Sequence, residues 1–345
     1  MARARGSKKA SPTRLATKSS SASGSTGSPK ISYAQGTGES HLKILVVGSI
    51  AYDAVETPAG RRESQLGGAA TYFSVSASYF TEVGLIGVVG DDFDPADIEM
   101  LGSHDIDTSG LIKADGKTFR WTGEYMEDIN TAVTLDTQLN VFGDFEPELS
   151  DEHANAPYLF LANIDPNLQL KVLDAMVKRP KMVANDTMNL WIDIARPVLT
   201  ELISRVDTLL INEEEAKQLT GEDHLPDAAN AIIKLGPNAT VIKRGEYGAT
   251  LFGRDFSFAA PAYPLERVVD PTGAGDSFAG GLMGYLASVD KVDEESLRTA
   301  TIVGSTMASF AVEDFGLDRI KNLTESDIAE RFKAFVELTR FNPLT

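Results

Sequence analysis

The sequence predicts an α/β fold with a mostly parallel central sheet and a small second sheet that projects from it. Residues 43–50 form a continuous apolar run ending in polar and small residues, as in a parallel strand buried on both faces. Strand and helix patterns alternate again from residue 158 to residue 221. Between these segments, residues 117–142 alternate with period two and are rich in β-branched and aromatic residues, which predicts antiparallel strands outside the parallel sheet.

Composition limits the classes of function that need be considered. The chain has 345 residues, 42% of them hydrophobic, and a net charge of −18, which disfavours nucleic acid as a main partner. No apolar run reaches the roughly 18 residues that a membrane span requires, so no membrane partner is expected. There is no cysteine, which excludes disulfides, thiolate metal sites and cysteine nucleophiles and fits a reducing compartment such as the cytoplasm. The four histidines are too scattered to predict a zinc site.

The first 40 residues differ from the remainder of the chain. Residues 1–38 contain seven basic residues and no acidic one, and the segment is rich in serine with few large apolar residues. Such a composition cannot form a buried core, so we predict a disordered basic tail over residues 1–40. The same composition also suits an organellar transit peptide, or a weak contact with nucleic acid.

The first half of the folded chain places polar and small residues where the first strand ends. Ligands of open α/β sheets bind beyond the carboxyl ends of strands, and Asp53 follows the strand over 43–50 directly. Asp53 is therefore a candidate ligand-binding residue, although an aspartate here also stabilises turns. Residues 54–66 read as a short strand, and Gly67 and Gly68 precede a helix that extends to Phe80. Residues 82–93 read as a strand followed by a turn.

The second half reads as a series of strands and helices. We expect the helix over 190–204 to be interrupted early by Pro197, and residues 239–252 to form a hairpin with a glycine turn. The remaining predicted strands are 158–163, 182–186 and 208–212, and the remaining predicted helices are 167–177, 213–221, 294–312 and 326–339.

Residues 269–281 are the most informative stretch of the chain. A helical pattern begins near Gly275 and Asp276, and the glycines before it leave backbone N–H groups accessible to an anion. An acid beside an anion site repels the anion, but it can serve as a base that takes a proton from an attacking hydroxyl. The alternative is a glycine-rich turn in which Asp276 is an ordinary first-turn acid. The segment is neither a Walker A loop nor a G-x-G-x-x-G turn.

The run from Asp270 to Gly281 closely resembles the C-terminal signature of the ribokinase-like (pfkB) family of carbohydrate and nucleoside kinases. The resemblance implies a three-layer ribokinase-like sandwich over residues 41–345, with a β lid formed by about 53–66 and 117–142. It also implies an ATP-dependent kinase that phosphorylates a hydroxyl of a sugar or sugar-like acceptor. In the family the lid covers the sugar and often forms a dimer surface, so a homodimer through the lid is expected.

The resemblance also assigns roles to individual residues. Asp276 would deprotonate the acceptor, while the backbone amides of Gly273, Ala274 and Gly275 would stabilise the transferred phosphoryl group. Asp53, Gly67 and Gly68 would hold the acceptor. Glu215 would bind Mg²⁺ through water, and a potassium requirement, known in some members, is neither supported nor excluded by Pro271 and Thr272. The residues expected at the nucleotide are Asn212, Lys243, Gly245, Gly248 and Ser305.

Two departures from the family pattern leave the acceptor open. Tyr72 stands where many sugar kinases carry asparagine, and no lysine follows Gly67 and Gly68 as it does in typical ribokinases. These differences disfavour ribose as the acceptor and are compatible with a bulkier or aromatic substrate. One alternative is therefore a nucleoside kinase with a base pocket formed partly by Tyr72 and the lid, and another is a non-catalytic nucleotide- or sugar-binding protein.

Overall fold

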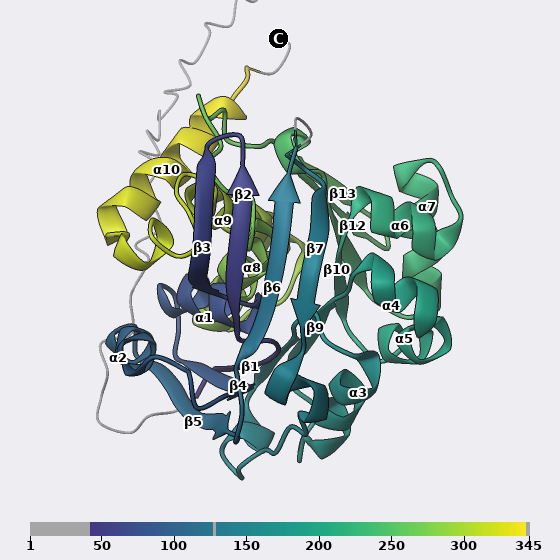
Figure 1. The fold of residues 1–345 in the computed structure, drawn as a ribbon. Helices are drawn as coiled ribbons and strands as arrows, with labels where there is room; N and C mark the ends of the chain where they lie inside the picture. Colours follow the sequence, from purple (N-terminus) through teal and green to yellow (C-terminus); the bar gives the residue numbers. More distant parts are fainter. Residues whose placement is uncertain (1–41, 127–128, 343–345) are drawn as a thin grey trace, which may run out of the picture. The chain divides into compact units, whose positions relative to one another are not determined.

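A nine-stranded sheet forms the centre of the computed structural model, which describes residues 42–126 and 129–342; the predicted tail over 1–40 lies outside the described residues (Figure 1). Seven neighbouring strands are parallel, and two further strands are antiparallel at one edge. From edge to edge the strands are β13 (Ser257–Ala260), β12 (Ala249–Gly253), β11 (Ala239–Lys243), β10 (Thr208–Asn212), β9 (Met182–Asp186), β8 (Tyr158–Leu161), β1 (Ile44–Val47), β4 (Val83–Val89) and β5 (Ile106–Lys113).

The order of the strands reverses beside β1. The chain runs outward from β1 through β4 to β5, and then returns to β8 on the other side of β1 before it continues through β9, β10 and β11. β1 therefore lies between β4, from which the chain continues to one edge of the sheet, and β8, from which it continues toward the other edge. In sheets of this kind, a ligand binds beyond the carboxyl ends of the strands at the point of reversal. Asp53 follows β1 at this point.

Helices cover both faces of the sheet and complete the predicted three layers. Consecutive residues of a buried strand point to opposite faces, so Ile44 and Val46 belong to one apolar cluster and Leu45 and Val47 to the other. The helices that contribute to the first cluster are α1 (Ala69–Ser78), α2 (Pro95–Ser103), α8 (Ala274–Val289), α9 (Glu294–Ala311) and α10 (Glu325–Leu338). Those that contribute to the second are α3 (Pro166–Ala175), α4 (Asn189–Ile194), α5 (Arg196–Ile203), α6 (Glu213–Thr220) and α7 (Leu225–Leu235).

The helix predicted over 190–204 is divided into α4 and α5. The break is at Ala195, whose φ of −128° and ψ of 21° are not helical, and Pro197 lies in the first turn of α5. Proline is tolerated there because the first N–H groups of a helix have no intrahelical partner. The interruption is therefore confirmed, and it takes the form of a new helix start. Short 3₁₀ turns are η1 (Asn140–Asp144), η2 (His153–Asn155), η3 (Gly245–Tyr247) and η4 (Ile320–Asn322).

The second sheet has four strands in the order β3 (Gly60–Gly67), β2 (Ala51–Thr57), β6 (Phe119–Tyr125) and β7 (Ala132–Gln138), and we call it the lid (Figure 1). The antiparallel pairing predicted over 117–142 is confirmed for β6 and β7. Residues 54–66, predicted as one short strand, belong to a hairpin of two. The central pair, β2 and β6, is parallel, because these strands come from separate excursions of the chain.

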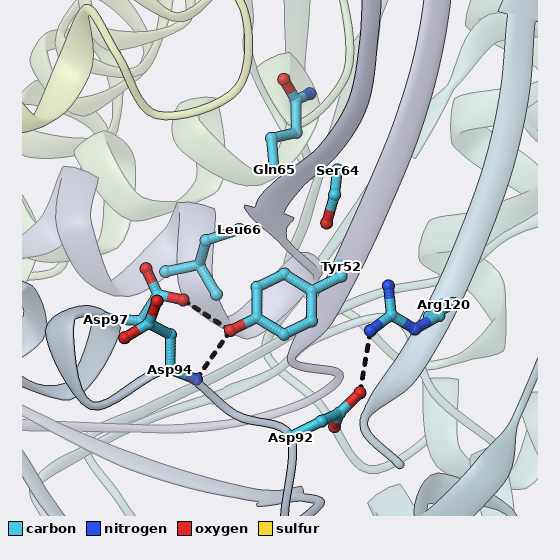
Figure 2. Close-up of a pocket in the computed structure, with 8 residues that line it drawn as sticks. All are labelled: Tyr52, Ser64, Gln65, Leu66, Asp92, Asp94, Asp97 and Arg120. Carbon is cyan, nitrogen blue, oxygen red and sulfur yellow. Dashed lines mark hydrogen bonds and ion pairs between the residues drawn. The ribbon is translucent and has the colours of Figure 1, made fainter.

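A hollow of about 400 Å³ lies at one end of the lid, beside the start of α2 (Figure 2). The hydroxyl of Tyr52 donates to Asp97 Oδ2 at 2.7 Å and accepts from the backbone N–H of Asp94 at 2.9 Å. Since Tyr52 and Asp53 are consecutive in a strand, this hollow lies on the face of the lid opposite to Asp53. Within the described part of the chain, no helix combines the length and the apolar character needed to cross a membrane.

Candidate functional site

The start of α8 has the form that the sequence predicts for an anion site. Gly273 precedes the helix with a left-handed backbone, φ 75°, and the helix begins at Ala274. The ring of Tyr72 packs against Gly273 so closely that a Cβ there would lie 2.4 Å from three ring atoms. Only glycine combines this backbone with this contact. The site is thus a helix N-terminus whose shape depends on an aromatic ring beneath it.

Asp276 lies in the first turn of α8, among other charged groups. Burial is the largest influence on its carboxyl group, and together with the nearby Asp186 carboxylate it raises the pKa of Asp276 to about 7. The Lys243 ammonium and the residue's own backbone N–H act in the opposite direction. A carboxyl group that titrates near neutral pH is suited to accept a proton from a hydroxyl, because a base works best when its pKa lies near the working pH.

Lys243 and Asp186 form a nearly buried ion pair behind the start of α8. Lys243 Nζ lies 2.8 Å from Asp186 Oδ2, and the two side chains are only 17% and 7% exposed. A Cβ at Gly275 would lie 3.0 Å from Lys243 Nζ, so the glycine gives this ammonium room beside the helix N-terminus. The carboxylates of Asp186 and Glu215 raise the pKa of Lys243 against the effect of burial. The predicted anion site is therefore adjacent to a fixed positive charge.

Asn212 and Glu215 form reciprocal hydrogen bonds at the start of α6. The Asn212 side chain accepts from the backbone N–H of Glu215 at 2.8 Å, and Glu215 Oε2 accepts from the backbone N–H of Asn212 at 3.0 Å. This reciprocal capping box accounts for both residue types without a ligand. Burial and the Asp186 carboxylate raise the pKa of Glu215 to about 7, so its carboxyl group also faces the ion pair.

Asp53 and the two glycines are brought together at the base of the lid. Asp53 is 4% exposed, and a Cβ at Gly67 would lie 1.9 Å from its Oδ2, so Gly67 makes room for the carboxylate. Gly68 has φ 93° and lies against the backbone of residues 49–51. Burial and the charge of Asp270 raise the pKa of Asp53 to about 7, and the backbone N–H of Gly68 lowers it.

Tyr72, which the sequence offers as a candidate for part of a base pocket, is buried in this structure. Its side chain is 1% exposed and its ring packs beneath Gly273, while Asp53 and Tyr125 of the lid act on its hydroxyl electrostatically. Among the described residues its hydroxyl has no hydrogen-bond partner, and burial raises its pKa well above the usual value. The aromatic residue that replaces the family's asparagine thus supports the helix start.

The other predicted nucleotide-site residues occupy one end of the β11–β12 hairpin or the neighbouring helix. Gly245 and Gly248 have positive φ, and a Cβ at Gly248 would lie 2.1 Å from the Ala260 carbonyl, so backbone packing accounts for Gly248. Gly245 lies against Asn130, which comes after β6 of the lid. Ser305 is buried in α9.

Three residues of this region were missed by sequence reasoning. Asp186 and Gln65 lie far along the chain from the groups they contact, and Tyr125 was assigned only to the lid strands over 117–142. Asp186 does have a signal, because it is the polar end of a buried strand, as Asp53 is. Tyr125 accepts a hydrogen bond from the Thr272 hydroxyl at 3.2 Å, and Gln65 donates to Asp270 at 3.0 Å.

Comparisons with known proteins identify a matching family and several relatives. The model of the pfkB family carbohydrate kinases matches residues 41–322. The chain is 35% identical over 250 residues to a cytidine kinase of Thermococcus kodakarensis, a match covering 71% of this chain and 88% of that one. It is 25% identical over 291 residues to a nucleoside kinase of Methanocaldococcus jannaschii, covering 79% of this chain and 91% of the relative.

Solved structures share the fold. A Burkholderia thailandensis nucleoside kinase in complex with inosine superimposes with a TM-score of 0.69 at 20% identity, over 87% of this chain and all of the other. Aminoimidazole riboside kinase from Salmonella enterica, complexed with aminoimidazole riboside and an ATP analogue, has a TM-score of 0.67 at 22% identity, over 84% and 99% of the two chains. At these identities the likeness concerns the fold.

Proposed function

This chain belongs to the pfkB family of carbohydrate kinases, and on that premise we propose that it transfers the γ-phosphoryl group of ATP to a hydroxyl of a nucleoside. The observation that carries the proposal is the placement of Asp276, a carboxyl group with a pKa near 7, in the first turn of a helix that begins with a left-handed glycine. The cytidine kinase and the nucleoside kinase named above support a nucleoside acceptor.

In the proposed reaction, Asp276 takes the proton of the acceptor hydroxyl as that oxygen bonds to the γ-phosphorus. The bond between this phosphorus and the bridging β–γ oxygen breaks, and ADP leaves with the electron pair. The backbone amides of Gly273, Ala274 and Gly275 would stabilise the charge on the transferred group, and the Lys243 ammonium beside Gly275 supports the same role. Asp53 would accept hydrogen bonds from acceptor hydroxyls, with Gly67 and Gly68 allowing a close approach.

The residues present fit a magnesium ion held mainly by the nucleotide. Mg²⁺ commonly uses one or two carboxylates, several waters and substrate phosphates, and the described residues contain no cluster of three or more metal-binding side chains. Glu215, helped by Asp186, would hold the ion through water. When bound, Mg²⁺ neutralises charge on the phosphate oxygens.

A panel of acceptors tests the proposed function. With ATP present, ribose, fructose, ketodeoxygluconate, adenosine and cytidine should be compared by ADP release and by detection of the phosphorylated product. We expect the largest kcat/KM for a nucleoside. A larger value for a free sugar would favour the sugar kinase that the sequence first suggested, and ATP binding without turnover on any acceptor would favour a non-catalytic binding protein.

Replacing Asp53 by asparagine should weaken the binding of the acceptor and leave the binding of ATP unchanged. Asparagine keeps the shape but loses the charge, and a hydrogen bond to a charged group is worth enough to lower kcat/KM for the acceptor by about 10- to 100-fold. The KM for ATP should change little, because Asp53 belongs to the lid. Steady-state kinetics with each substrate varied in turn measure the difference, and equal losses for both substrates would count against the assignment.

The pH dependence of turnover should show an acidic limb near neutrality. The pKa values of Asp53 and Asp276 are both raised to about 7, so below that pH Asp276 cannot take a proton and Asp53 lacks the charge that strengthens the hydrogen bonds it accepts. The kcat/KM for the acceptor should therefore rise with pH and become constant above about pH 7. In Asp53→Asn the limb should become less steep. A profile that is flat across neutrality would show that neither carboxyl group titrates as described.

A further inference from the structure

Gln65 lies opposite Asp53 on the strand pair that forms the base of the lid. Asp53 in β2 and Gln65 in β3 are direct partners in an antiparallel ladder, and partners of this kind project to the same face. The side chains nevertheless have different neighbours: Asp53 lies against Gly67, and Gln65 reaches Asp270. A displacement of this strand pair therefore moves both side chains together.

Asp270 is a completely buried carboxylate just before the turn into α8. Its Oδ1 accepts from the backbone N–H of Thr272 at 2.9 Å, and its Oδ2 accepts from the backbone N–H of Gly316 at 3.1 Å and from Gln65 Nε2 at 3.0 Å. Hydrogen bonds to a carboxylate are stronger than those between neutral groups. The Thr272 bond fixes the turn that leads to Gly273, so the orientation of Asp270 sets the geometry of the helix start.

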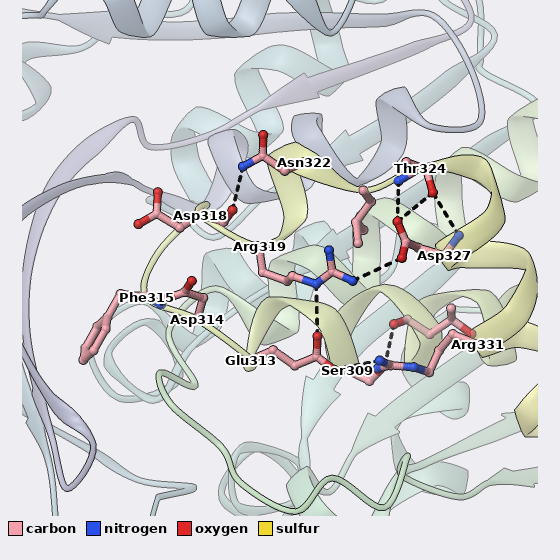
Figure 3. A network of polar contacts seen from close by, with 12 residues as sticks. Ser309, Glu313, Asp314, Phe315, Asp318, Arg319, Asn322, Thr324, Asp327 and Arg331 are labelled. Carbon is pink, nitrogen blue, oxygen red and sulfur yellow. Dashed lines mark hydrogen bonds and ion pairs between the residues drawn. The ribbon is translucent and has the colours of Figure 1, made fainter.

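The donors to Asp270 come from different parts of the fold. Gly316 belongs to a loop fixed by the ion network of Figure 3, in which Glu313 accepts from Arg319 at 3.1 Å and from Arg331 at 2.7 Å. Arg331 also donates to Ser309 of α9 at 2.9 Å. Gln65 instead comes from the lid. The lid therefore supplies one of the bonds that hold this carboxylate.

Other lid contacts converge on the same short segment. The Thr57 hydroxyl of β2 donates to the Val269 carbonyl at 2.8 Å, and the Thr272 hydroxyl donates to Tyr125 of β6 at 3.2 Å. Among these contacts only Gln65 reaches a carboxylate.

We propose that Gln65 is a positioning residue, which joins the acceptor-binding strands of the lid to the anion hole through Asp270. The helix start then has its working geometry when the strand pair carrying Asp53 is in place over the acceptor. This inference rests on the proposed kinase function, and it assigns Gln65 an effect on phosphoryl transfer without contact with the reacting atoms.

Replacing Gln65 by leucine tests this role. The variant loses one hydrogen bond to a buried carboxylate, which is expected to lower kcat by about 10- to 100-fold. Both KM values should stay within about twofold of wild type, because the lost interaction acts on the transition state. A residue that only stabilises the lid would instead lower the melting temperature without this selective loss of kcat.

Replacing Gln65 by glutamate gives a second readout. Two carboxyl groups in this position cannot both ionise, but with one shared proton the new side chain again donates to Asp270. The kcat of Gln65→Glu relative to wild type should therefore rise as the pH falls. Asp270 raises the pKa of Asp53 of β2, Tyr72 of α1 and Tyr125 of β6, and Arg120 of β6 lines the same hollow as Gln65 (Figure 2).

Gln138→Glu is the matched control. Gln138 also lies in the lid and donates to an aspartate, Asp136, at 2.7 Å, but it is exposed. Its kcat should equal that of wild type at every pH. If wild type phosphorylates an acceptor while Gln65→Leu keeps a normal kcat, or changes only the acceptor KM, the positioning role is wrong. If wild type turns over no acceptor, the proposed function fails and this inference fails with it.

Discussion

Replacing Asp276 by asparagine is expected to reduce kcat by at least about 10²- to 10⁴-fold, the usual contribution of a general base. The amide keeps the size of the side chain but cannot take the proton of the acceptor hydroxyl. Single-turnover and steady-state rates of product formation measure the loss. Binding of ATP and acceptor should persist, because the glycine turn, Lys243 and Asp53 are unchanged.

The folded state of this variant should be at least as stable as wild type at pH 8. The pKa of Asp276 is raised in the folded protein, so the ionised carboxylate destabilises the fold above about pH 7 relative to a neutral side chain. Asp290→Asn is the control for the same substitution at the other end of α8. Asp290 caps that end with a left-handed backbone that asparagine also adopts, so this variant should keep the kcat of wild type. Near-normal turnover by Asp276→Asn would overturn the proposed mechanism.

Replacing Lys243 by methionine should have the largest effect on stability of the substitutions considered. The change leaves the buried Asp186 carboxylate without its cation, and breaking a buried ion pair in this way typically costs about 3–5 kcal/mol. It also removes the ammonium beside Gly275, so we expect a higher KM for ATP as well. Urea unfolding and initial rates with ATP varied give the two quantities.

A double variant separates the two effects of Lys243. Asp186→Asn combined with Lys243→Met removes both charges, so much of the lost stability should return while the KM for ATP stays high. Lys217→Met is the control, because the Lys217–Glu213 pair is more exposed and should contribute less than about 1 kcal/mol. Equal stability losses for Lys243→Met and Lys217→Met would contradict the buried pair.

The parts of the site that the sequence could predict are local in the chain. The glycines before Asp276 and the helix after it lie within a few residues of one another, so the helix N-terminus follows from the sequence pattern alone. The alternating pattern of residues 117–142 predicted the second sheet in the same way. The parallel pairing of β2 with β6 could not be predicted, because it joins two excursions whose sequences carry no register signal.

The hydrogen bonds and ion pairs that set the charge and geometry of the site could not be predicted from the sequence. Asp186 and Lys243 are 57 residues apart, and Gln65 and Asp270 are 205 apart. Only the assembled fold determines which buried polar side chains meet. For Tyr72, the sequence showed that the family's asparagine is absent, but the contact with Gly273 was needed to show that the tyrosine supports the helix start.

The reversal of strand order beside β1 has a consequence for how this kinase can diversify. The lid and Asp53 come from the segment before β8, whereas Lys243, Glu215 and the start of α8 all come after it. The residues that we propose for acceptor binding and those that we propose for phosphoryl transfer thus lie in successive halves of one polypeptide. Mutations in the first half can therefore change which acceptor is bound while the second half is conserved. The one requirement is that Gln65 keeps its hydrogen bond to Asp270.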